Sequence, residues 1–190
     1  MKRLVLILAF VCVSAGCTSN TAPAASRYFL RTAVTPSGVA SADARIGLAR
    51  VDVAPYLEPG GLAIETAPGQ IQWAANHEWA EPLSAGLAFF LRGALSSAVG
   101  AEVGLHAAGG DWPYTVDVFV EALHGTMQGD AVIVASYRIV QPGRTAADFR
   151  FTQRSALARP GYPAMVEAEK ALLRELAHAI AGSLRAAGAS

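Results

Sequence analysis

The stretch Asn76-His77-Glu78-Trp79-Ala80-Glu81-Pro82-Leu83 marks the point where an extended segment ends and the first long helix begins. Pro82 suits the first helical position, because its ring fixes φ near a helical value and its missing N–H would have no partner there. Glu78 and Glu81 would place negative charge near the exposed N–H groups of this helix end. We expect Trp79, just before the helix, to cover the helix entrance.

The residues after Pro82 predict an α-helix that runs to about Val99. Apolar side chains recur there at steps of three and four residues, which is the spacing of one helical face. They are Leu83, Leu87, Phe90, Leu91, Ala94, Leu95 and Ala98. A well-built helix start is by itself a sufficient explanation for the whole stretch.

The same stretch also carries a family resemblance. Trp79-Ala80-Glu81-Pro82-Leu83 resembles the hallmark of the ABC-type transport auxiliary lipoproteins, the PqiC-like family. The upstream run Val53-Ala54-Pro55-Tyr56-Leu57 is similar to a strand end of that family, and the resemblance extends from about Tyr28 to the C-terminus. It implies that Pro55, Tyr56 and Leu57, together with Trp79 to Leu83, are structural or partner-binding residues. The chain departs from the family at Pro59 and Gly60, where a charged residue is usual.

The N-terminus has the pattern of a secretory signal peptide over residues 1–16. Lys2 and Arg3 precede ten apolar residues, too few to span a bilayer, which needs about 20. The following Ser14-Ala15-Gly16-Cys17 resembles a bacterial lipobox, although Leu is usual where Ser14 stands. The resemblance implies that Cys17 is acylated and becomes the mature N-terminus. Cleavage by an ordinary signal peptidase is the alternative.

Residues 17–26 are small and polar, which indicates a lipidated tether before a single domain over residues 27–190. As a flexible coil, the part from Thr18 to Ser26 spans on the order of 17 Å, so the domain would stay close to the membrane. Thr18 after the cysteine favours the periplasmic face of the outer membrane, by resemblance to enterobacterial lipoproteins. Cys12 leaves with the signal peptide and Cys17 would be acylated, so no intrachain disulfide is expected.

The order of the remaining elements predicts an α+β fold. It comprises one mainly antiparallel β-sheet with two long α-helices packed on one face. The expected strands are Tyr28–Arg31, Ile46–Val53, Leu62–Thr66, Gln70–Ala75, Ala101–Leu105, a strand from Tyr114, Ala131–Ile139 and Phe149–Leu157. The second helix follows Pro163, with a buried stripe of Met165, Leu172, Leu173, Leu176, Ile180 and Leu184.

The strand that begins at Tyr114 alternates apolar and polar residues, except at Phe119 and Leu123. We expect these two side chains to face solvent, which would hint at a partner surface. The polar face of this strand and its neighbour carries Asp117, Glu121 and Arg138. Because the opposite face must cover the helices, these three residues are the predicted docking face.

Charge and motifs exclude several functions. The chain has 15 basic and 15 acidic residues, and loss of Lys2 and Arg3 with the signal peptide leaves 13 basic residues. Without a basic run, a nucleic-acid partner is not expected. The histidines His77, His106, His124 and His178 are widely spaced, and there is no Gly-x-Ser-x-Gly elbow or phosphate-binding loop. The sequence therefore predicts no metal, no cofactor and no enzymatic activity.

Two binding functions remain. The resemblance implies a non-catalytic lipoprotein subunit of an MCE/ABC-type intermembrane lipid transport system, which docks on the periplasmic MCE protein at the outer membrane. It also implies self-association in a ring. The alternative is a free-standing outer-membrane lipoprotein that binds an apolar ligand or assists envelope assembly.

Overall fold

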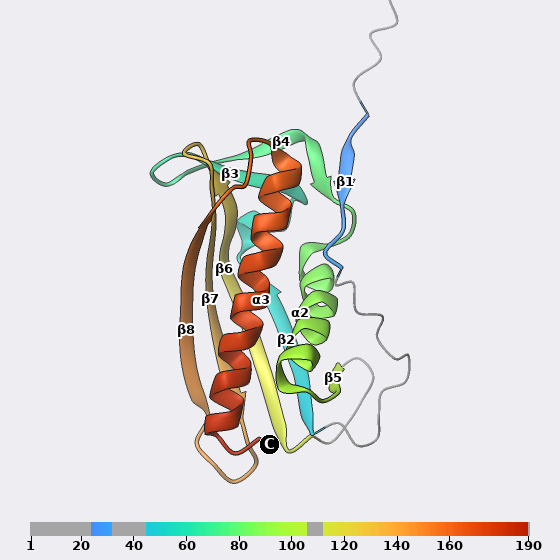
Figure 1. Ribbon diagram of the computed structural model, residues 1–190, viewed down its shortest axis with the longest axis vertical. Helices are drawn as coiled ribbons and strands as arrows, with labels where there is room; N and C mark the ends of the chain where they lie inside the picture. Colours follow the sequence, from blue (N-terminus) through green and yellow to red (C-terminus); the bar gives the residue numbers. More distant parts are fainter. Residues whose placement is uncertain (1–23, 32–44, 106–111, 190) are drawn as a thin grey trace, which may run out of the picture.

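The computed structural model describes residues 24–31, 45–105 and 112–189, which form one sheet covered by two long helices. Both helices lie on the same face of the sheet (Figure 1). The strands are β1 (Ser26–Tyr28), β2 (Ile46–Val53), β3 (Gly61–Ala67), β4 (Gln70–Trp79), β5 (Val103–Leu105), β6 (Tyr114–Thr126), β7 (Asp130–Val140) and β8 (Ala147–Ala156). The helices are the short 3-10 helix η1 (Pro55–Leu57), α2 (Leu83–Val99) and α3 (Tyr162–Ala186).

Strand β6 is the centre of the sheet. On one side it pairs antiparallel with β7, which pairs antiparallel with β8. On the other side it pairs in parallel with β2 and, further along, with β3. Strand β4 lies antiparallel to β3, and β1 and β5 add short parallel strands to β4 and β2. The predicted α+β fold is confirmed, and the parallel pairs make the sheet a mixed one.

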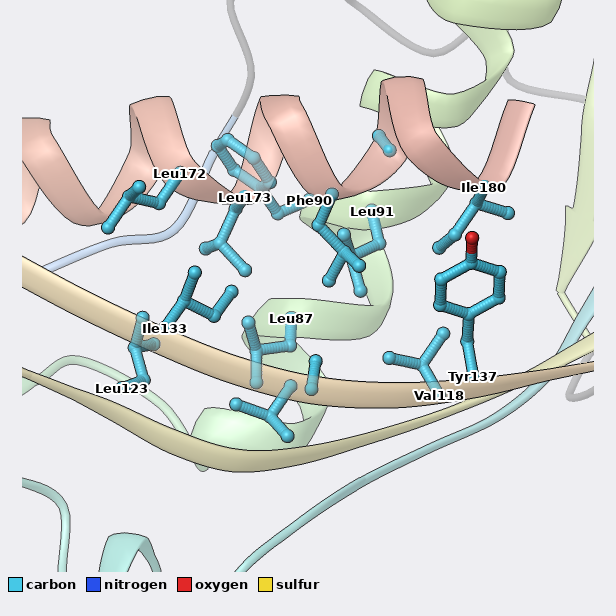
Figure 2. Close-up of a cluster of buried hydrophobic side chains, with 14 of the residues drawn as sticks. Leu87, Phe90, Leu91, Val118, Leu123, Ile133, Tyr137, Leu172, Leu173 and Ile180 are labelled. Carbon is cyan, nitrogen blue, oxygen red and sulfur yellow. The ribbon is translucent and has the colours of Figure 1, made fainter. Parts of the chain in front are cut away.

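The core lies between the sheet and the two helices. Figure 2 shows Leu87, Phe90 and Leu91 of α2 and Leu172, Leu173 and Ile180 of α3 above the side chains of β6 and β7. All six of these helix residues are at most 1% exposed, so both predicted apolar stripes are buried. Burial of each such side chain contributes about 1.5–3 kcal/mol, which makes this layer the main source of stability.

Strand β6 contains a β-bulge that changes which side chains face the core. The register with β7 shifts between Val120 and Ala122. One extra residue reverses the alternation, so Leu123 turns inward and is only 2% exposed. The expectation that Leu123 faces solvent is therefore wrong. Phe119 precedes the bulge and is 41% exposed, as expected.

The boundaries around the first helix differ from those expected. Pro82 is the N-cap, with an extended ψ of 128°, and the helix begins at Leu83. It ends before Gly100, whose φ of 73° is a left-handed conformation that glycine adopts without strain. The first strand is Ser26–Tyr28 rather than Tyr28–Arg31. Strand β4 extends beyond the expected Ala75 to Trp79.

Candidate functional site

The N-terminal segment is held against the sequence stretch that starts the first helix. Strand β1 pairs in parallel with the end of β4, with Ser26 opposite His77 and Tyr28 opposite Trp79. The Ala80 N–H donates to the Tyr28 carbonyl oxygen at 2.9 Å. We call this region the junction and define it as residues 26–31 together with 77–81.

Two arginines of the N-terminal segment pair with the two glutamates of the junction. Arg27 Nε donates to Glu78 Oε1 at 2.7 Å. Arg31 forms a two-point pair with Glu81, in which Nη2 donates to Oε2 at 2.8 Å. The first turn of α2 holds no acidic residue and its N-cap side chain makes no hydrogen bond. Both carboxylates are thus paired with arginines, while Glu81 Oε1 also lies beside Gly86 near the start of α2. The favourable placement of their charge relative to the helix N-terminus stays a prediction.

His77 connects three elements at the junction. Its Nδ1 shares a hydrogen bond of 2.9 Å with the Tyr28 hydroxyl, and its ring stacks on Tyr162 with centroids 4.0 Å apart. Tyr162 is the first residue of α3. The Glu78 side chain pairs with Arg27 instead. Successive side chains of a strand point to opposite faces, so His77 and Glu78 are expected to point apart. His77 and Glu78 thus do not face one common substrate position.

Trp79 is a buried plug at the start of α2. It is 8% exposed, and its backbone N–H donates to the Gly60 carbonyl oxygen at 2.7 Å. Leu83, at the other end of the motif, is 4% exposed. The buried side chains of Trp79 and Leu83 are therefore part of the core, while Glu81 at 21% side-chain exposure reaches outward to Arg31.

The upstream motif forms the 3-10 helix η1. Leu57 is 3% exposed, and the Tyr56 carbonyl oxygen accepts a hydrogen bond of 3.0 Å from Trp73 Nε1. Burial raises the pKa of the Tyr56 hydroxyl, a hydrogen bond with the Leu123 backbone opposes the rise, and the Glu169 carboxyl adds to it. The turn after η1 reaches Trp79 through the Gly60 carbonyl, so the two motifs support the same region of the fold.

The predicted docking residues share the outer face of the sheet, opposite the helices. Asp117 and Arg138 line an open hollow of about 350 Å³, which also holds the exposed ring of Phe119. Arg138 pairs with Asp148 through bonds of 2.6 and 3.1 Å. These bonds raise the pKa of Arg138 and lower that of Asp148. Glu121 pairs with Arg150 at 2.7 and 3.1 Å.

Sequence reasoning did not find the remaining polar residues of this face. Arg50 and Asp52 of β2 line the same hollow, next to Asp117. Asp148 lies opposite Arg138 in the register of β7 and β8. Their positions depend on strand pairing, which no local pattern in the sequence reveals.

Sequence reasoning also missed a buried acid, Glu169 of α3. It is 1% exposed, its Oε2 has no hydrogen-bond partner among the residues that the structure describes, and burial raises its pKa to about 8. A sequence signal existed, because Glu169 lies four residues after Met165 and four before Leu173, on the same helical face.

The described residues contain no group of three or more His, Cys, Asp or Glu that could hold a metal ion. None of the helices in the described ranges is long and apolar enough to cross a bilayer. Cys17, the predicted lipidation site, and His106 lie outside the described residues.

Fold and junction together define a two-layer α+β domain whose N-terminal strand is secured to the start of its first helix. The chain belongs to the family of ABC-type transport auxiliary lipoprotein components, whose model matches residues 28–181. No curated protein matches the chain.

Solved structures share the fold. An uncharacterized protein is 24% identical, with a TM-score of 0.72 over 85% of this chain and 99% of its own. A Xanthomonas campestris protein of the DUF330 family is 14% identical, with a TM-score of 0.63 over 87% of this chain and 95% of its own. A PelC dodecamer from Paraburkholderia phytofirmans is a weaker match, at 9% identity and a TM-score of 0.45 over 82% of this chain and 91% of its own.

Proposed function

We propose that this chain is a non-catalytic, lipid-anchored subunit of an ABC-type intermembrane lipid transport system. It docks on the system's periplasmic MCE protein from the periplasmic face of the outer membrane. The observation that carries the proposal is the family match over residues 28–181, which runs from the last residue of β1 into the final turns of α3 and includes the Trp79–Leu83 motif.

The membrane anchor is the lipid on Cys17. Its support is the charged start, the short apolar run and the small residues that precede Cys17. The intact mass of the protein extracted from membranes is expected to include acyl chains on an N-terminal Cys17. Cys17→Ser is expected to move the protein to the soluble periplasmic fraction. An unacylated mass in the membrane extract would contradict this part of the proposal.

The docking surface is the outer face of the sheet around Phe119. An exposed aromatic ring in a hollow, surrounded by charged side chains, is the usual arrangement of a binding hot spot with a polar rim. Asp117, Glu121 and Arg138 belong to this rim. Arg138 pairs with Asp148 of the adjacent strand β8, and Glu121 of β6 reaches across β7 to Arg150 of β8. These two ion pairs restrict the side chains of Arg138 and Glu121, which lowers the entropy cost of binding.

The test is crosslinking in native membranes, followed by identification of the captured proteins. The native chain is expected to capture the MCE protein, and Phe119→Asp is expected to abolish the capture. Phe89→Asp is the matched control, because Phe89 is also a half-exposed phenylalanine but lies on α2. Equal loss for both variants would point to a folding defect or another surface.

The same experiment distinguishes this function from the alternative of a free-standing lipoprotein. Recovery without any MCE component, under conditions in which a control complex survives, would favour that alternative. Self-association in a ring belongs to the proposal as well, and native mass spectrometry of the detergent-solubilised lipoprotein would measure it. A monomer at all protein concentrations would contradict the proposed self-association in a ring.

A further inference from the structure

Two large apolar side chains are exposed at the end of the molecule where the chain enters the fold. Trp73 of β4 is 46% exposed, and Met127, in the turn between β6 and β7, is 67% exposed. The Met127 N–H donates to the Glu65 carbonyl oxygen of β3 at 3.3 Å, which places this turn beside the β3–β4 hairpin. Figure 1 shows the hairpin lying across the end of the molecule from which β1 enters.

The length of chain between Cys17 and the fold limits which surface can meet a membrane. Nine residue steps separate Cys17 from Ser26, and a fully extended chain covers at most roughly 3.6 Å per residue, or about 32 Å. Strand β6 alone, with 13 residues at about 3.3 Å each, extends for about 43 Å between the two ends of the domain. An orientation with the β7–β8 turn down on the bilayer would hold Ser26 about 43 Å above it, beyond the reach of the tether, so that orientation is excluded.

The near end has side chains suited to a lipid surface. Trp73 Nε1 already donates to the Tyr56 carbonyl oxygen at 3.0 Å, so the exposed part of the indole is apolar and needs no further hydrogen bond. Tryptophan is enriched at membrane–water interfaces, and methionine adapts to irregular apolar surroundings. Arg159 is exposed in the loop between β8 and α3, and the N–H of nearby Leu157 donates to Gly129 of the β6–β7 turn at 2.8 Å. This arginine adds a positive charge that attracts anionic headgroups.

Two other exposed aromatic side chains, Phe29 and Phe89, are less suited to contact with lipid. Phe29 and Phe89 both lie under the Arg31 guanidinium, with the ring centroids 5.5 and 5.3 Å from its central carbon. Arg31 in turn is paired with Glu81. The exposed faces of these rings thus carry a bound ion pair, which would be costly to bring into contact with lipid.

We infer that the β3–β4 hairpin and the β6–β7 turn face the membrane, with Trp73 and Met127 in contact with the phospholipid surface. The inference rests on the proposed lipidation of Cys17. It goes beyond that function by fixing the orientation of the domain. The long axis stands away from the bilayer, and the outer face of the sheet is left free for a protein partner.

Site-specific fluorescence quenching tests the orientation on the full lipidated chain. An acylated Cys17 has no free thiol, so a single introduced cysteine can be labelled with an environment-sensitive fluorophore. The positions are Trp73→Cys and Met127→Cys at the near end. The controls are Phe89→Cys on α2 and Arg144→Cys, an exposed position in the turn between β7 and β8 at the opposite end. Each labelled protein is reconstituted in phosphatidylethanolamine and phosphatidylglycerol vesicles, with and without a nitroxide attached to the lipid headgroup.

We expect the nitroxide to cause a loss of fluorescence at positions 73 and 127 and none at positions 89 and 144. Phe89 is the matched control for Trp73, since their exposures of 49% and 46% are nearly equal. Met127→Cys changes a side chain that is 67% exposed, so it keeps the test valid if Trp73→Cys impairs folding. Equal quenching at all positions, or no quenching at position 127, would overturn the orientation.

The intact mass of each sample separates this inference from the function on which it rests. An unacylated Cys17 would overturn the anchor and the orientation together. An acylated protein without quenching at positions 73 and 127 would overturn the orientation alone. Capture of the MCE protein by crosslinking does not depend on either result.

Discussion

At the scale of single residues, Glu169 is the side chain least suited to its surroundings. It is buried in α3, one of its oxygens has no partner within residues 24–31, 45–105 and 112–189, and burial raises its pKa from 4.5 to about 8. At neutral pH the folded protein therefore holds this carboxyl protonated, whereas the unfolded chain releases the proton near pH 4.5. The folded state thus binds one more proton than the unfolded state between these two pH values.

This difference predicts a pH dependence of stability. The free energy of unfolding has its full value below about pH 4.5 and falls as the pH rises to about 8, by up to about 1.4 kcal/mol per pH unit. Glu169→Gln has no titrating group and is expected to remove this slope. Urea unfolding of both proteins at several pH values measures it.

Glu167→Gln is the control for this prediction, because Glu167 lies on the same helix with a side chain that is 66% exposed. It is expected to keep the native slope. A native stability that stays level from pH 5 to 8 would show that Glu169 is ionised in the folded protein or has a hidden partner.

At the scale of elements, the start of α2 depends on one buried indole. Trp79→Ala would leave a cavity between the helix entrance and the Gly60 turn, at a cost of about 3–5 kcal/mol. For a domain of this size each kcal/mol lowers Tm by about 2–4 °C, so a loss of more than about 6 °C is expected in a thermal melt.

Trp73→Ala serves as the matched control for Trp79→Ala. Trp73 is 46% exposed, so its truncation is expected to lower Tm far less. The sequence left open whether Trp79 is a plug or a partner-binding residue. A Trp79→Ala protein with native Tm that no longer captures its partner would support the second role.

The elements also show what the sequence could predict. Helices α2 and α3 follow from local periodicity, because each buries a single regular face, and β7 and the first part of β6, up to Val120, follow from their alternation. The parallel pairing of β2 with β6 joins residues more than 60 positions apart, and alternation in a strand carries no information on its direction. The bulge after Val120 is likewise not visible in the sequence, so the sequence pattern placed Leu123 on the wrong face of the sheet.

The junction could be predicted only in part. The motif residues themselves were evident, and the burial of Trp79 followed from its position before an apolar helix. The arginine partners of Glu78 and Glu81 lie about 50 residues earlier in the chain, Arg27 in a strand of only three residues and Arg31 just after it. A segment so short has no periodicity, and its pairing depends on the completed end of β4.

At the scale of the whole molecule, the junction determines where the N-terminal segment leaves the domain. Strand β1 has only three residues, so its attachment depends on the side-chain contacts of Arg27 and Arg31 with Glu78 and Glu81. Such exposed ion pairs contribute about 0–1 kcal/mol each to global stability. Their larger effect is expected to be local, on the opening of β1.

We therefore predict that the double variant Arg27→Ala/Arg31→Ala keeps nearly the native Tm but exchanges the amide hydrogens of residues 26–31 faster. Local opening of β1 exposes the Ala80 N–H, which otherwise donates to Tyr28, so exchange at Ala80 should also accelerate. Hydrogen exchange with mass spectrometry measures both segments. Lys170→Ala is the control, since it removes an ion pair within α3 that does not involve β1. In vesicles, a loosened β1 would let the domain tilt on its lipid, so the quenching at position 127 should weaken while acylation stays complete. Native exchange rates in the double variant would show that the backbone pairing of β1 with β4 holds the segment without the arginines.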